Sequence, residues 1–252
     1  MPPSKKLEEI FEIPRIYEEE KWHSPAGRLV REVVFGLNDG VVSTIGFLFG
    51  VAGALPRHEM VLIAGLTEVL AGAVSMFFGG YLSTKSQQEF FGHEIAREKR
   101  EIEEMPDHER DEIRRIYRAK GFSDESELDL VVKRITADKR IWLKCMMEEE
   151  LGLILEHMDP PIKVGAVIGA SFLAGGFIPL ISFVFLEGSP ALTTSLLFTS
   201  AALFVLGGIK TVLTRRPWIR SGFEAFLIGM LAAGAGYLIG LFLKQFFSGA
   251  II

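Results

Sequence analysis

The sequence is poor in cysteine, asparagine and glutamine. A single cysteine, Cys145, excludes a disulfide framework or a cysteine-based zinc site within one chain. One asparagine and three glutamines stand beside abundant Glu, Lys and Arg, a thermophile tendency that favours a prokaryotic source. Residues 1–28 lack the apolar core of a signal peptide, and we expect an amphipathic helix there, or a solvated arm.

Charge is also nearly absent from five long windows. Only two charged side chains, Asp39 and Glu68, occur in them. A soluble domain keeps a polar stripe on its helices, whereas apolar runs of about 20 residues match the thickness of a bilayer. The composition excludes a soluble enzyme, a secreted scaffold and a disordered chain, and predicts an all-α membrane protein with five transmembrane helices. The windows are residues 33–55, 60–84, 164–186, 191–209 and 225–243.

Basic residues flank these windows unevenly. Lys and Arg cluster before the first window, between the second and third, and between the fourth and fifth, whereas the opposite loops and the C-terminal tail hold only Arg57 and Lys244. Positive charge stays in the cytoplasm. We therefore expect the N-terminus and residues 85–163 to be cytosolic and the C-terminus to lie outside.

The segment 85–163 is long enough to form a domain outside the bilayer. Its apolar residues recur at helical spacing, which predicts a cytosolic helical domain inserted between spans two and three. Its 15 Lys plus Arg against 20 Asp plus Glu suit cations and argue against nucleic acid. The predicted organisation is an N-terminal amphipathic segment 1–28, spans one and two in 29–84, the acidic metal-binding domain 85–163 and spans three to five in 164–252.

Helix boundaries within this domain follow from its breaker residues. Nothing between Leu82 and Glu104 forces a break, so its first helix should continue out of span two. Pro106 with Asp107 is expected to stop that helix and cap the next, and Gly121 followed by Ser123 or Asp124 predicts a second break.

Asp39 and Glu68 are the most informative residues within the spans. An intramembrane carboxylate costs several kcal/mol unless it faces a wet cavity or a partner. A rise of about 1.5 Å per residue places Asp39 roughly 9 Å and Met76 roughly 12 Å from the cytosolic ends of spans one and two. Two carboxylates and a thioether predict a path for a cation that is neither wholly hard nor wholly soft, although Met76 alone fits simple packing.

The acidic domain holds a second set of ligand types. Glu94, Glu98 and Glu101 share one helix face, and Glu109 and Glu112 lie three apart after Pro106. Like charges at this spacing repel unless something neutralises them. Met146, Met147 and Glu150 follow, and the methionine pair is expected to be exposed because it lies among charged residues. Carboxylates and thioethers together predict a transition-metal site, whereas the glutamates alone also fit a solvated face.

The chain resembles the vacuolar iron transporter family from about residue 28 onward. The resemblance is carried by REVVFGLNDG, by AGAVSMFFGGYLSTKS, by WLKCMMEEELGL and by the glutamate ladder. The glutamate ladder is the set Glu94, Glu98, Glu101, Glu109 and Glu112. It implies five spans, a homodimer with the ion path at its two-fold axis, proton-coupled antiport of Fe²⁺ or Mn²⁺, and a cytoplasmic domain that collects metal. The path residues it implies are Asp39, Glu68 and Met76, with Glu32 before the first span; the domain ligands are Glu98, Glu101, Glu109, Glu112, Met146, Met147 and Glu150.

Three classes of function are compared for this sequence. The leading one is export of divalent metal from the cytosol in exchange for protons, with Fe²⁺, Mn²⁺, Co²⁺ or Zn²⁺ as the ion and no organic cofactor. The second is a membrane-anchored metal buffer or sensor, which would not need acids within its spans. The third, an oxidoreductase resembling a membrane ferritin, would want Glu-x-x-His motifs, and residues 85–163 contain none. The membrane would be the cell membrane in a prokaryote and the vacuolar membrane in a eukaryote.

Overall fold

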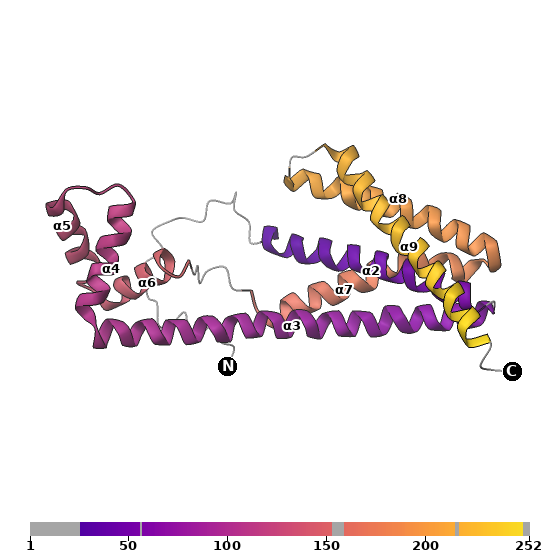
Figure 1. Cartoon of the computed structure of the whole chain (residues 1–252), viewed down its shortest axis with the longest axis horizontal. Coiled ribbons are helices and arrows are strands. Elements are labelled where there is room, and N and C mark those ends of the chain that lie inside the picture. The colour runs from indigo at the N-terminus through magenta and orange to yellow at the C-terminus, as the bar shows by residue number, and fades with distance from the viewer. Residues whose placement is uncertain (1–25, 56, 153–158, 215–216, 249–252) are drawn as a thin grey trace. The chain divides into compact units, whose positions relative to one another are not determined.

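All regular structure in the described residues is α-helical. The computed structural model describes residues 26–55, 57–152, 159–214 and 217–248, and the amphipathic segment expected in 1–28 lies almost wholly outside them. Five of the helices are long and apolar enough to cross a membrane, which confirms the predicted spans. In chain order the helices (Figure 1) are α2 (Ala26–Ala54), α3 (His58–Glu104), α4 (Pro106–Ala119), α5 (Glu125–Ile135), α6 (Lys139–Glu149), α7 (Pro161–Phe185), α8 (Gly188–Thr214) and α9 (Trp218–Ser248).

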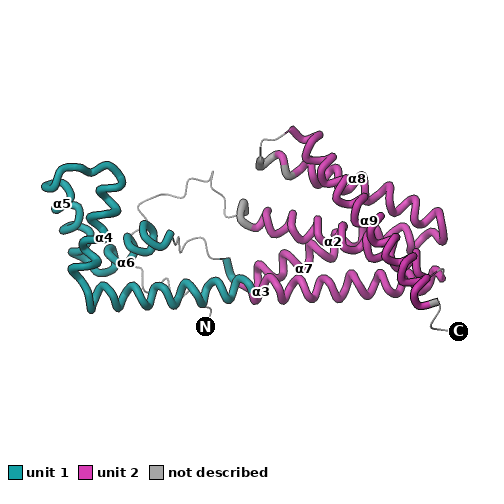
Figure 2. Tube along the Cα trace, viewed as in Figure 1, with its two compact units in different colours: residues 1–18, 83–160 teal, residues 19–82, 161–252 magenta. Residues whose placement is uncertain are grey.

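The described residues divide into two compact units (Figure 2). Residues 83–160 belong to the first unit, and residues 26–82 and 161–248 to the second. Helix α3 contributes to both, because its 47 residues continue past the apolar window without a break, as predicted. A helix of that length spans about 70 Å, more than twice the hydrocarbon thickness. The apolar window 60–84 alone is long enough to cross the hydrocarbon core.

The second unit is organised around α2, which packs against both α7 and α9. Small residues allow the backbones to approach closely, as in many membrane bundles. A Cβ atom on Gly36 would lie 2.5 Å from the carbonyl oxygen of Ile168 in α7. Gly46 and Gly50 of α2 play the same part opposite Gly236 and Gly240 of α9. The helix that carries Asp39 is thus held on two sides by backbone contact.

The first unit is a small bundle with its own hydrophobic core. The core joins α3, α4, α5 and α6 through Ile95, Ile102, Ile113, Val132, Trp142, Leu143, Met146 and Met147. Asp124 caps α5 by accepting hydrogen bonds from the backbone N–H groups of Ser126 and Glu127, after Gly121 has turned the chain with a φ of 103°. The expected cap at Asp107 is wrong: Met105 is the N-cap residue without a side-chain hydrogen bond, and Pro106 begins the helix because its missing N–H needs no partner there.

Gly36→Ala should destabilise the second unit, because neither of the backbone atoms nearest the new methyl group, Ile168 O at 2.5 Å and Phe172 N at 3.2 Å, can move without shifting α7. Overpacking of this kind costs about 1–3 kcal/mol. Thermal unfolding in detergent should show a lower midpoint. Gly234→Ala in α9 is the matched control, since no atom lies within 4 Å of its added Cβ. Equal midpoints for the two variants would contradict the close contact of α2 with α7.

Candidate metal site and membrane carboxylates

Three carboxylates from different helices converge in the first unit. Oxygen atoms of Glu98, Glu109 and Glu150 all lie within 4.8 Å of one another. Glu98 lies on the inner face of α3 between the core residues Ile95 and Ile102. Glu109 is in the first turn of α4, and Glu150 is the C-cap residue of α6. The bundle therefore brings together residues that are up to 52 positions apart.

Two of these carboxylates are buried without neutralising partners. The side chains of Glu98 and Glu109 are 1% and 2% exposed. Within the described part of the chain, Glu98 Oε1 and Glu109 Oε2 are buried and have no hydrogen-bond partner. Buried polar atoms are normally paired, and an unpaired buried charge is expensive. An arrangement of this kind requires a proton or a cation to be stable.

The local electrostatics favour a proton when no metal is present. Burial, followed by the negative charge of Glu150, raises the pKa of Glu98 to about 8. Burial is also the main cause of the raised pKa of Glu109 and of Glu150. Since the ordinary pKa of glutamic acid is 4.5, folding retains a proton on Glu98 between pH 4.5 and about 8. The free energy of unfolding of the metal-free chain therefore falls as pH rises through this range.

The same geometry fits a divalent cation. Carboxylate oxygens bind a first-row metal at about 2.0–2.2 Å, so two ligands lie at most about 4.4 Å apart. The oxygen atoms of the three glutamates lie within 4.8 Å of one another, so a shift of less than half an ångström would bring them to the separation of two metal ligands. The two orphaned oxygen atoms supply lone pairs that a metal would satisfy. A divalent cation would exchange for the proton on Glu98, because a metal ligand must be ionised.

Glu101 and Glu112, the other two predicted carboxylate ligands, flank this group. Their negative charges raise the pKa of Glu109, which places them in the same electrostatic environment. Each lies near an arginine: Arg97 Nε is 3.6 Å from Glu101 Oε2, too far for a hydrogen bond, whereas Arg115 donates a hydrogen bond of 2.8 Å to Glu112 Oε1. Sequence reasoning missed both arginines, although their spacing of four and three residues from these glutamates allows such pairing on a helix.

The expectation of an exposed methionine pair is wrong. Met146 and Met147 are 0% and 1% exposed and form part of the core with Ile113 and Trp142. The helix α6 turns both thioethers inward, and the charged residues that surround them in the sequence face water. Because the two methionines lie within one turn of Glu150, their role as metal ligands stays a prediction. Their burial alone also fits simple packing in the core.

Asp39, Glu68 and Met76, the residues predicted to line the membrane path, are all half-buried within the second unit. Among the described residues, no hydrogen bond or ion pair involves the Asp39 or Glu68 carboxylate. Five residues beyond Asp39, the hydroxyl of Thr44 is fully buried and also lacks a hydrogen-bond partner in that part of the chain. Glu32 pairs instead with its neighbour Arg31 at 2.7 Å.

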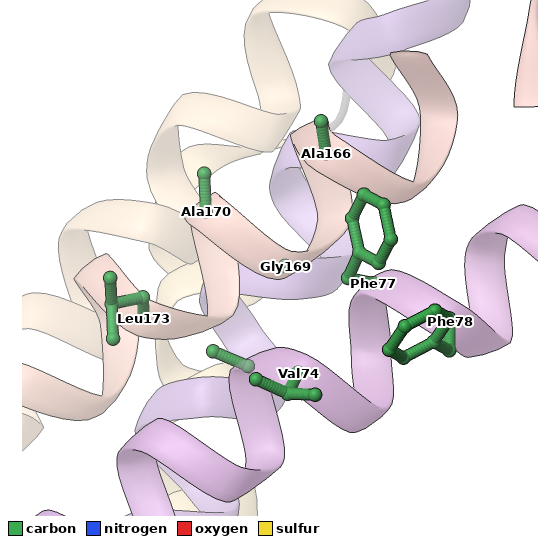
Figure 3. Close-up of a pocket in the computed structure, with 8 residues that line it drawn as sticks. Val74, Phe77, Phe78, Ala166, Gly169, Ala170 and Leu173 are labelled. Atoms are coloured by element: carbon green, nitrogen blue, oxygen red, sulfur yellow. The ribbon is translucent and has the colours of Figure 1, made fainter. Parts of the chain in front are cut away.

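The cavity between α3 and α7 is apolar and offers no ligand for a cation. It has a volume of 260 Å³, and Figure 3 shows its side chains projecting from the two helices. Its apolar lining suits a hydrocarbon group, and it contains none of the carboxylates described above. Its lining residues are Ala73, Val74, Phe77, Phe78, Ala166, Gly169, Ala170 and Leu173.

Comparison with known proteins assigns the chain to a family. The family model described as the VIT family matches residues 30–241. Vacuolar iron transporter 2 of Oryza sativa is 36% identical over 217 residues, which cover 85% of this chain and 87% of the relative. Vacuolar iron transporter 1 of Arabidopsis thaliana is 34% identical over 86% of this chain and 87% of its own length. Vacuolar iron transporter of Plasmodium falciparum is 32% identical over 86% of this chain and 82% of its own. With its five membrane helices, this integral membrane protein belongs to the VIT family, a family of transporters.

Proposed function

We propose that this protein exports Fe²⁺ or Mn²⁺ from the cytosol in exchange for protons, and that its first unit captures the metal. The observation that carries the proposal is the convergence of Glu98, Glu109 and Glu150, two of them buried with orphaned oxygen atoms. Relatives that share most of the chain are named vacuolar iron transporters. Co²⁺ and Zn²⁺ suit the same ligand types.

Proton exchange is supported by the chemistry of the carboxylates. A buried acid that keeps its proton near neutral pH must release it when a cation takes its place. In the second unit, Asp39 and Glu68 would bind the metal ion and the proton in turn. Met76 would be a thioether ligand, and Glu32 would lie at the cytosolic entrance of the path. The uneven Lys and Arg distribution supports a cytosolic N-terminus and first unit and an external C-terminus. A homodimer with α2 and α3 lining its axis would complete the path.

A metal buffer or sensor is the second candidate. The carboxylates of the first unit lie on a bundle with its own hydrophobic core, so capture does not by itself require transport. Flux through the membrane separates the two functions. A buffer would bind metal in detergent but carry none into proteoliposomes.

Binding of Mn²⁺ should release protons from Glu98 at pH 7, where a pKa of about 8 keeps it mostly protonated. We expect about one proton per metal at pH 7 and fewer at pH 9, with the affinity falling about tenfold for each pH unit below 8. Titration calorimetry in buffers of different ionisation enthalpy counts these protons. Glu98→Gln should lose the release, whereas Asp111→Asn, at an exposed carboxylate on α4, should retain it. Proton release that survives in Glu98→Gln would assign it to another group.

Asp39→Asn should abolish metal flux in proteoliposomes while the protein still folds, because the amide removes the charge that replaces cation hydration and preserves side-chain volume. Initial rates of Mn²⁺ uptake under a fixed pH gradient provide the measurement. Glu59→Gln, at an exposed carboxylate in the first turn of α3, is the control and should transport normally. Wild-type flux in a folded Asp39→Asn protein would remove Asp39 from the path.

The two sets of carboxylates should affect different kinetic constants. A double variant, Glu98→Gln with Glu150→Gln, should lower flux at scarce metal and recover the wild-type maximal rate at high metal, as expected for loss of capture. Asp39→Asn should lower the maximal rate at every concentration. Glutamine is preferred to changes at the core residues Met146 and Met147, which would also loosen the bundle. An equal fall in maximal rate for the double variant would show that the first unit belongs to the transport step itself.

A further inference from the structure

Arg97 lies between two glutamates on α3 and contacts them unequally. Its Nη1 atom is 3.0 Å from Glu94 Oε2, a normal hydrogen-bond distance. Its Nε atom is 3.6 Å from Glu101 Oε2, which is too long for a hydrogen bond. The guanidinium is thus anchored on Glu94, which is not among the predicted ligands, and rests loosely against Glu101, which is.

The guanidinium atom that faces Glu101, Nε, is also the one that is buried. Arg97 Nε is excluded from water and has no hydrogen-bond partner among the described residues. The positive charge of Arg97 also lowers the pKa of Glu150, against the larger upward effect of burial. Arg97 therefore acts on carboxylates from two helices of the acidic group, and its Nε retains an unused donor.

We propose that Arg97 is a resident cation of this acidic group: it screens Glu101 while metal is absent, and an entering metal displaces it from Glu101 so that Glu94 alone holds it. The inference rests on the proposed metal site of the first unit and adds the means by which that site discriminates. Arg97 is a positioning residue in this scheme, because it contacts the ligands and not the metal.

The resident guanidinium differs from the proton on Glu98 in one respect. A guanidinium stays charged at every physiological pH, so its competition with the metal does not fade as the solution becomes more alkaline. An ion pair that is partly exposed is weak, and a divalent ion that gains several carboxylate ligands at once overcomes it. A monovalent ion gains less from each carboxylate, so the same competition weighs more heavily against Na⁺ or K⁺.

The test is titration of the full-length protein in detergent with Mn²⁺, at pH 7.5 and constant salt, by calorimetry. Arg97→Gln should bind Mn²⁺ about two- to five-fold more tightly than wild type, the range expected for loss of one partly exposed ion pair. Arg97→Lys, which keeps the charge, should stay close to wild type. Arg100→Gln removes an exposed arginine one turn along α3 and is the control for a general loss of positive charge.

Glu94 provides the second arm of the test. Glu94→Gln should weaken Mn²⁺ binding, because Arg97 then rests fully on Glu101. In the Arg97→Gln background the same change should have almost no effect on Mn²⁺ binding, since in this scheme Glu94 acts on the metal site through the arginine. Thermal midpoints close to wild type would establish that each variant is folded.

Each outcome has a defined meaning. Tighter binding in Arg97→Gln, together with loss of the Glu94 effect in the double variant, supports the resident cation. Unchanged or weaker binding in Arg97→Gln, the same gain in Arg100→Gln, or a Glu94 effect that persists without Arg97 overturns it. If wild type binds no Mn²⁺, or Glu98→Gln with Glu109→Gln binds as wild type does, the proposed metal site fails and this inference falls with it.

Discussion

The structure depends on the free-energy penalty of a carboxylate that has left water without a partner. This penalty operates in both units, at Asp39 and Glu68 within the spans and at Glu98 and Glu109 within the bundle. A chain under no functional demand would replace such groups with apolar residues of similar volume. Here the helices retain them without a fixed partner among the described residues, so that a proton or a cation is the group that we propose to balance them. Reversible neutralisation is the property that a carrier of metal ions needs.

Much of the fold follows from the sequence because its strongest signals are local. The five spans are windows nearly free of charge, and hydrocarbon thickness converts their length directly into helices. The uninterrupted α3 follows from the absence of any breaker before Pro106. Asp124 caps α5 in accordance with a preference that operates within three residues. In each case the physical cause lies within one turn or one window.

The site was less predictable because its geometry is tertiary. The glutamate ladder does not reveal that Glu98 and Glu109 face the core while Glu101 faces Arg97, since all three lie in a run of charges. The methionine pair differs from its prediction for the same reason. Neighbouring charges predict exposure, whereas the inward face of the short helix α6 buries Met146 and Met147. Which carboxylates converge is decided by how α4 and α6 pack on α3, and no spacing rule encodes that.

The order of the carboxylates along the chain affects how the protein is made. Glu98, Glu109 and Glu150 all precede α7, α8 and α9, and synthesis proceeds from the N-terminus. Contacts that close over about 50 residues or fewer form quickly, because little chain must be ordered before they form. The acidic bundle can therefore fold before the synthesis of the last spans is complete. If the three carboxylates bind metal as proposed, a nascent chain of this protein can take up its first ion before its last spans are complete.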